Sequence, residues 1–138
     1  MLKVRGYVSS RKFLDNRVPQ HVQNLVIRDY CNRKGFLFLL SAVEFAMPNS
    51  FITMEKVLSE LPEIDGIVFY SLFQLPAEND DRKKIYSRVL EKKCTIHFAV
   101  ESLKVKTQED ILRVENIWAV SDILSDVTPV SSLENYIG

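Results

Sequence analysis

The sequence predicts an α/β domain, a three-layer sandwich built around a mainly parallel sheet of four or five strands. Strand-like and helix-like segments alternate along the chain, and two of the strand segments are apolar almost throughout. Such alternation is typical of parallel sheets that are covered by helices. The chain has 138 residues, 46% of them hydrophobic, which suits one continuous core.

The first strand and the first helix follow from residue type and spacing. Residues 2–8 predict a strand because β-branched and aromatic residues gather there. A helix is expected over residues 18–35, with Pro19 in its first turn and Gly35 after a basic last turn. The apolar residues at helical spacing are Val22, Leu25, Val26 and Tyr30.

A second strand and a second helix come next. Residues 36–40, FLFLL, are apolar throughout, which predicts a strand buried on both faces. Residues 50–61 predict a helix with Ser50 as its capping residue. The apolar side of this helix consists of Met54, Val57, Leu58 and Leu61.

The second half of the chain repeats the alternation. Residues 64–73 predict a buried strand, and residues 79–93 a helix with acidic residues first and basic residues last. Residues 94–100 predict a fourth strand, and residues 107–124 a fourth helix that opens with a capping-box pattern at Thr107. The apolar stripes of these two helices are Ile85, Tyr86, Val89 and Leu90, then Ile111, Val114, Ile117 and Trp118.

Domain organisation, charge balance and apolar runs limit the classes of protein to which this sequence can belong. Residues 1–124 are expected to form a single domain, and residues 125–138 a tail that is docked or serves as an oligomer arm. Eighteen basic and eighteen acidic residues balance, which argues against a dedicated nucleic-acid binder. With no signal-like or membrane-spanning apolar run, we expect a cytoplasmic protein without membrane contact. Cys31 and Cys94 are expected to be buried, reduced thiols.

The sequence predicts neither a cofactor nor a metal site. Its four glycines are scattered, so neither the dinucleotide fingerprint nor a phosphate-binding P-loop can be written. His21 and His97 have no second ligand at a spacing that metals use. His21 is expected to be exposed, and His97 to be a core or pocket histidine, with titration beside a hydroxyl as the alternative.

Polar residues follow each predicted strand, where ligands gather in open α/β sheets. After the four strands, these residues are Ser9, Ser10 and Arg11, then Ser41 and Glu44, then Tyr70, Ser71 and Gln74, and finally Glu101 and Ser102. The candidate catalytic residues are Ser9, Glu44 and Glu101. The candidate ligand-binding residues are Ser10, Arg11, Arg17, Gln20, Ser41, Tyr70, Ser71 and Gln74.

The order of motifs resembles the catalytic domain of the serine recombinases, which implies a resolvase-like or flavodoxin-like fold. In that family the first strand ends in Tyr-x-Arg-Val-Ser, and its serine attacks a DNA phosphate; YVS ends here at Ser9. Further similar positions are Gln23, Ile27, Tyr30 and Gly35 in the first helix, Leu72 to Leu75 after the third strand, and Glu101 and Thr107 after the fourth. The resemblance covers about residues 2–110.

The departures from that family concern its chemistry. Attack on a phosphodiester needs cationic groups around the phosphoryl group, yet Tyr7 stands where the family has arginine before Val-Ser. Phe73 and Gln74 replace its Asp-Arg pair, and no Arg-Pro motif begins the second helix. The sequence also lacks a helix-turn-helix pattern and a basic arm with which to bind DNA. For these reasons DNA strand exchange is the alternative and not the leading hypothesis.

Longer segments resemble a second family, the sporadic carbohydrate cluster proteins of bacterial surface-polysaccharide gene clusters. The similar runs are RGYVSSRKFLDNRVPQHVQNLVIRDYC, LLSAVEFAMPNS and LPEIDGIVFYSLFQLP. This resemblance implies a role in the assembly of cell-surface glycans and supplies no reaction.

Three hypotheses follow. In the first, the protein binds a small anionic or sugar-derived ligand at the strand ends, with Arg11 and Arg17 holding the anion. Ser9, Ser10, Tyr70 and Gln74 would bond ligand hydroxyls. If the protein is an enzyme, which the sequence leaves open, Glu44 and Glu101 would be its acid and base. In the second, it is a non-enzymatic, homo-oligomeric partner of glycan enzymes, anchored through Trp118, Ile123 and Tyr136. The third is recombinase-type strand transfer.

Overall fold

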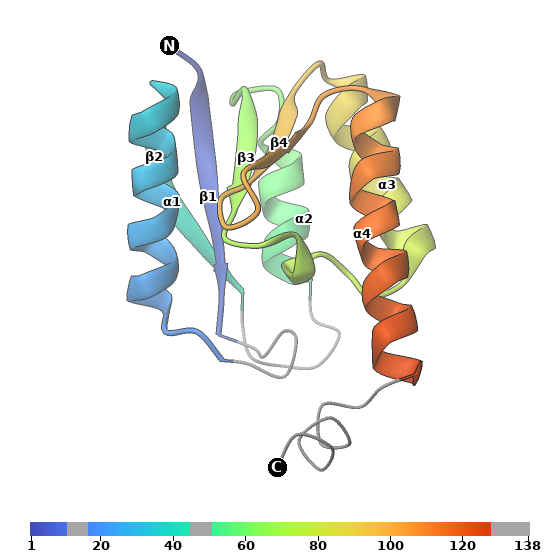
Figure 1. The fold of residues 1–138 in the computed structure, drawn as a ribbon. Coiled ribbons are helices and arrows are strands. Elements are labelled where there is room, and N and C mark those ends of the chain that lie inside the picture. Colours follow the sequence, from blue (N-terminus) through green and yellow to red (C-terminus); the bar gives the residue numbers. More distant parts are fainter. Residues whose placement is uncertain (11–16, 45–50, 128–138) are drawn as a thin grey trace.

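The computed structural model describes residues 1–10, 17–44 and 51–127, with side chains to residue 124 (Figure 1). Its strands are β1 (Lys3–Ser9), β2 (Leu37–Glu44), β3 (Gly66–Phe69), β4 (Thr95–Phe98) and β5 (Leu103–Val105). Its helices are α1 (Gln20–Lys34), α2 (Ile52–Ser59), α3 (Asn79–Glu91) and α4 (Gln108–Val127), with a 3₁₀ helix η1 (Leu72–Gln74) after β3.

One mainly parallel sheet organises these elements in the order β2-β1-β3-β4-β5. The first four strands pair in parallel, and β5 pairs with β4 in antiparallel register. The expected fold class is confirmed. The chain passes from β1 to β2 on one side and then returns to β3 on the other, so the order reverses between β1 and β3.

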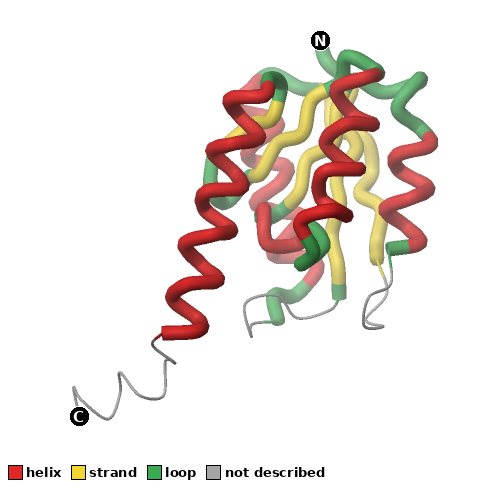
Figure 2. Tube along the Cα trace, turned by 90° about the vertical axis from the view of Figure 1, so that its right-hand side faces the viewer, coloured by secondary structure: helices red, strands yellow, loops and turns green. Residues whose placement is uncertain are grey.

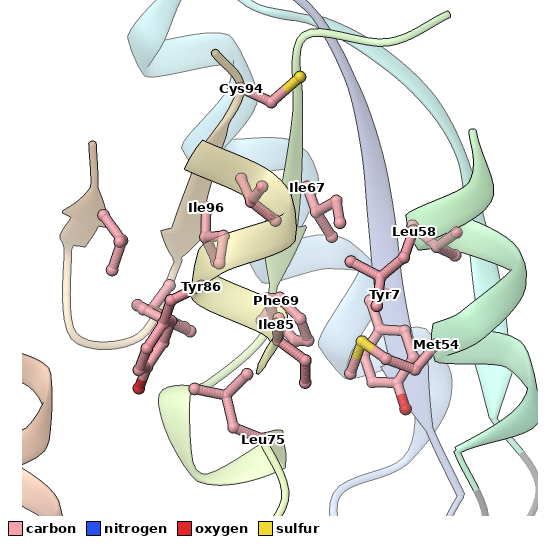
Figure 3. Close-up of a cluster of buried hydrophobic side chains, with 14 of the residues drawn as sticks. Tyr7, Met54, Leu58, Ile67, Phe69, Leu75, Ile85, Tyr86, Cys94 and Ile96 are labelled. Carbon is pink, nitrogen blue, oxygen red and sulfur yellow. The ribbon is translucent and has the colours of Figure 1, made fainter. Parts of the chain in front are cut away.

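Helices cover both faces of the sheet, which confirms the three layers. On one face, Ile27, Tyr30 and Cys31 of α1 pack on Val4 and Val8 of β1. On the other face, α2, α3 and α4 enclose a larger core that contains the aromatic side chains of Tyr7 and Phe69 (Figure 3). Phe98 belongs to the same core. The C-terminal turns of α4 extend beyond the other helices (Figures 1 and 2).

Two expectations about apolar residues are corrected. The second strand is not buried on both faces: among the described strands, β2 pairs with β1 alone, and Leu37 and Leu40 are exposed. An edge strand can be as apolar as a central one, so the apolar run did not reveal its position. In α1, Leu25 is exposed, and the buried face instead follows Gln23, Ile27 and Tyr30.

The helix ends agree with several expected signals. Gly35 ends α1 in the left-handed conformation with φ of 71°, which glycine adopts without strain. Thr107 and Asp110 exchange the two hydrogen bonds of a capping box at the start of α4. Ser50 lies outside the described residues. The boundary expected after residue 124 falls inside α4, which continues to Val127.

Candidate functional site

The candidate site lies at the carboxyl edge of the sheet, where β1 and β3 end beside each other. Ser9 is the last residue of β1, and η1 with Gln74 follows β3 closely. In open α/β sheets the crevice for ligands forms where the strand order reverses, because the connections leave in opposite directions there. The fold therefore places these two residues at the expected crevice.

Three buried polar side chains from three elements meet at this point. Gln74 Nε2 donates to Ser9 Oγ at 3.3 Å and to Gln23 Oε1 at 2.9 Å. Gln23 bonds both the amide and the carbonyl of Ser9, at 3.1 and 2.7 Å, and also the carbonyl of Val18. Ser9 and Gln23 are 0% exposed and Gln74 is 1% exposed. The network fixes the end of β1 to α1 and η1.

This network continues toward β4 through the cap of η1. Gln74 Oε1 accepts from the amide of Ser71, whose hydroxyl accepts from the amide of Phe73. The carboxylate of Glu101 then accepts from Ser71 Oγ at 2.8 Å and from the amide of Leu72 at 3.0 Å. The sequence-predicted residues Ser9, Ser71, Gln74 and Glu101 are thus brought into one chain of hydrogen bonds.

Glu44 belongs to a second buried cluster, at the end of β2. Its carboxylate accepts from Tyr7 Oη at 2.9 Å and from the amides of Thr53 and Met54 at 3.1 and 3.0 Å. The N-cap residue of α2, Phe51, has no side-chain capping bond. Glu44 supplies that cap from the neighbouring strand, and its charge is favourable at a helix N-terminus.

The two candidate acid–base carboxylates do not face one reacting atom. Glu44 ends β2 and Glu101 follows β4, so three strand spacings of the sheet, roughly 14 Å, separate their strands. Both carboxylates also accept from backbone amides, of α2 and of η1 respectively. The geometry gives each a positioning role in its own loop.

The candidate serines on the first two strands have different surroundings. Ser10 donates through its amide and hydroxyl to the carbonyl of Glu44, at 3.3 and 3.2 Å, and is half-buried at the site edge. Ser41 lies within β2 and not after it, because β2 continues to Glu44. Its hydroxyl donates to Asn24 Oδ1 at 2.6 Å, which ties β2 to α1.

The candidate residues in the link before α1 are more accessible. Arg17 is exposed and Gln20, the first residue of α1, is half-buried. Tyr70, directly after β3, is also half-buried and has further contacts. These three residues are thus more accessible than Ser9, Gln23 and Gln74. Arg11 lies outside the described residues.

Gln23 is a site residue that the candidate set omitted. It stands on the buried face of α1, four residues before Ile27 and seven before Tyr30. A polar residue in phase with a buried apolar stripe needs a buried hydrogen-bond partner, and this signal could have identified Gln23. The stripe predicted from the sequence had a different phase, so the signal was missed. Only the packing of α1 on β1 identifies that partner as the backbone of Ser9.

His97 is a buried histidine on the α1 face of β4, as its strand position predicted. Its Nδ1 lies 2.9 Å from Tyr30 Oη and its Nε2 lies 2.9 Å from Thr95 Oγ1. Burial, followed by the charges of Lys104 and Lys34, lowers the pKa of His97 to about 4. The ring is therefore neutral at physiological pH and both nitrogens have hydroxyl partners.

The described residues contain neither a cluster of metal ligands nor a membrane-spanning helix. Within residues 1–10, 17–44 and 51–127, no three His, Cys, Asp or Glu side chains gather as metal ligands would. None of the helices in that same part of the chain has the length and apolar character needed to span a bilayer. Cys31 and Cys94 are buried and unbridged, as expected.

Comparisons with known proteins bear on the fold. No protein-family model and no curated protein matches the sequence. Among solved structures, the N-terminal catalytic domain of TP901-1 integrase matches with a TM-score of 0.62 and 12% identity, covering 90% of this chain and 98% of that chain. A resolvase family site-specific recombinase from Streptococcus pneumoniae matches with a TM-score of 0.62 and 8% identity, covering 97% of this chain and 96% of that chain.

These matches extend over nearly the whole chain on both sides, while identities of 8% and 12% are too low to carry a function. They agree with the observed α/β architecture. The chain has a resolvase-like α/β fold.

Proposed function

We propose that the protein binds a small anionic or sugar-derived ligand at the carboxyl edge of β1 and β3. The observation that carries this proposal is the buried network of Ser9, Gln23 and Gln74 at the point where the strand order reverses. Burying three polar side chains gains little stability over apolar ones, so such a network is better explained by the shape it gives to a ligand site.

In this proposal the buried residues shape the site and the accessible ones contact the ligand. Arg17 supplies the cation, because an exposed guanidinium offers a planar fork of donors to an oxyanion. Ser10, Gln20 and Tyr70 bond hydroxyl groups at the half-buried rim. Ser9 is fully buried, so its hydroxyl does not meet solvent as an attacking nucleophile would.

The biological context of the proposal is the assembly of surface carbohydrates in the cytoplasm. Its support is the resemblance of RGYVSSRKFLDNRVPQHVQNLVIRDYC and two further runs to the sporadic carbohydrate cluster proteins. Nucleotide sugars and sugar phosphates combine an oxyanion with hydroxyl groups, which are the two kinds of group that this edge is suited to bind.

Thermal unfolding with a ligand panel tests the proposal. The panel contains nucleotide sugars, sugar phosphates, inorganic phosphate and sulfate. At a free ligand concentration of about ten times Kd, binding adds about 1.4 kcal/mol to the free energy of unfolding. This increase raises Tm by roughly 4 °C for a domain of this size. Arg17→Gln should abolish the rise, whereas Arg113→Gln, an exposed arginine of α4, should retain it. A panel that leaves Tm unchanged, or a rise that survives Arg17→Gln, refutes the site.

A second candidate function is a scaffold that acts through α4. Leu112, Val120, Ile123 and Leu124 are exposed on this helix, and its C-terminal turns extend beyond the other helices (Figure 1). Exposed apolar patches of this kind mark interaction surfaces. Trp118 does not belong to that surface: it is 8% exposed and packs between Arg82 and Phe73. Tyr136 lies outside the described residues.

The scaffold reading predicts a homo-oligomer. Sedimentation analysis of the wild type should then give a mass above 16.0 kDa that Ile123→Ser reduces. Asn116→Ser, an exposed polar residue of the same helix, serves as the control. A monomeric wild type, or an oligomer indifferent to Ile123→Ser, removes this function.

Recombinase-type strand transfer is the remaining alternative, supported by the fold and by the position of Ser9. Tyr7, which replaces the arginine of that family, donates to Glu44 and contributes no positive charge. We therefore expect no DNA binding in a gel shift, even at low salt where phosphate contacts are strongest. Salt-dependent retardation would reverse this choice.

A further inference from the structure

A hollow of about 210 Å³ lies between α2 and α3, on the side of the molecule that carries the larger core. Its lining residues are Phe51, Met54, Glu55, Leu58, Pro76, Asp81, Lys84, Ile85 and Arg88. None of them belongs to the site at the carboxyl edge of β1 and β3. The volume exceeds that of the 150 Å³ engineered cavity that accepts benzene. It is therefore large enough for one ring or one branched side chain.

The floor of this hollow is apolar. Met54 and Leu58 of α2 and Ile85 of α3 are at most 6% exposed, and they form part of the core shown in Figure 3. Pro76, which precedes α3, is also buried. An apolar group that enters the hollow contacts these side chains and leaves water, which gives the favourable term of binding.

The rim of the hollow carries charges of both signs. Arg88 Nη1 donates to both carboxylate oxygens of Glu55, at 2.9 and 2.8 Å. Among the described residues, no ion pair includes Lys84 or Asp81, and Glu55 is the one partner of the Arg88 guanidinium. The rim thus offers an ammonium, a carboxylate and the unused edge of a guanidinium.

These charged groups lie on one side of α3. Asp81 and Lys84 are three residues apart and Lys84 and Arg88 four, which are the spacings of neighbours on a helix surface. An adjoining groove shares Glu55, Lys84 and Arg88 with the hollow and is completed by Lys83 and Ser87. Unpaired charges of opposite sign above one apolar floor match a ligand that is zwitterionic and has an apolar body.

We propose that this hollow binds a free α-amino acid with an aromatic or branched apolar side chain. The side chain lies on Met54, Leu58 and Ile85. The carboxylate pairs with Lys84 and with the open edge of Arg88, whose fork suits a carboxylate. The ammonium pairs with Asp81.

The proposal is tested by titrating the protein with defined probes and monitoring its amide NMR signals. L-Phenylalanine and L-leucine, at up to about 10 mM, tenfold above a millimolar Kd, should shift the signals of Lys84, Ile85 and Met54. 3-Phenylpropionate lacks the ammonium and 2-phenylethylamine lacks the carboxylate, so each should bind roughly five-fold more weakly. L-Lysine, which lacks an apolar body, should leave these signals unchanged.

Variants separate the charge contacts from the fold. Asp81→Asn should weaken L-phenylalanine roughly five-fold and leave 3-phenylpropionate unchanged, while Lys84→Gln should weaken both. Asp80→Asn and Lys92→Gln remove exposed charges of the same signs outside the rim, so they should bind like the wild type. The proposal would be overturned if none of the probes shifted these signals, or if L-phenylalanine and 3-phenylpropionate bound with equal affinity. Wild-type affinity of Asp81→Asn for L-phenylalanine would also overturn it.

Discussion

Acidification should destabilise the protein through His97. The ring is 4% exposed, and its two nitrogens are held by Tyr30 and Thr95, each at 2.9 Å. Burial is the largest cause of a pKa near 4, and the nearby cations Lys104 and Lys34 add to it. In the unfolded chain the ring is hydrated and titrates near 6.5.

The magnitude follows from linkage between protonation and folding. Between about pH 6.5 and 4 the unfolded chain holds a proton on His97 that the folded chain does not, so stability falls as pH falls. A difference of about 2.5 pKa units corresponds to about 3 kcal/mol. Roughly 2 kcal/mol of it is lost between about pH 7 and pH 4.5. That loss is a large part of a typical domain's stability of about 5–15 kcal/mol.

Urea unfolding of the wild type and of His97→Gln at the two pH values measures this loss. Carboxylates contribute to the pH dependence of both proteins. The contribution of His97 is therefore the difference between the wild type and the variant in how much unfolding free energy each loses between the two pH values. His97→Gln keeps a polar group at the buried site and removes the titration. We expect the advantage of the wild type over the variant to shrink by about 2 kcal/mol at the lower pH.

Parallel pH dependences for the two proteins would refute the reasoning. An NMR titration of the His97 ring in the folded protein gives an independent check. Its midpoint should lie near pH 4, well below the ordinary value. A midpoint at the ordinary value would show that the buried ring accepts its proton without cost.

Three further predictions concern unfolding free energies measured in urea. Glu44→Gln should destabilise by about 2 kcal/mol, because the amide nitrogen of glutamine faces donors where a carboxylate oxygen accepted them. Gly66→Ala should cost about 1–3 kcal/mol, since the new Cβ lies 2.7 Å from the carbonyl oxygen of Thr95; an unchanged midpoint would contradict that clash. Glu115→Gln should cost about 3 kcal/mol, because it leaves the buried guanidinium of Arg82 without its anion; Glu109→Gln, on the exposed start of α4, is the comparison that should stay near zero.

The elements could be predicted where local pattern alone defines them. For α3, the acidic start, the basic end and the apolar stripe predicted the helix correctly. The stripe residues Ile85, Tyr86 and Val89 are all buried. β5 was not identified as an element, because three residues are too few for a periodic signal and its pairing with β4 supplies the rest. The exposure of β2 could not be read from FLFLL, because position in the sheet is a long-range property.

The candidate site was predicted in part for the same reason. The carboxyl ends of the strands follow from the fold class, so Ser9, Ser71, Gln74 and Glu101 could be named in advance and are joined by hydrogen bonds. Their partners could not be named. The bond of Gln74 to Ser9 joins residues 65 apart in sequence, and sequence periodicity contains no information on such separations.

The alternation of strands and helices and the polar character of the strand ends could be predicted from the sequence, because both depend on residue type at short spacing. The packing of distant segments sets how those polar residues are used, and it divides the apolar residues into two clusters, one on each face of the sheet. The packing buries Ser9 against the side-chain amides of Gln23 and Gln74. It also makes Glu44 the cap of α2 and places Asp81, Lys84 and Arg88 around an apolar hollow. The physical reason is that a hydrogen bond or an ion pair requires two groups within a few ångströms, and only the packing of distant segments creates that proximity.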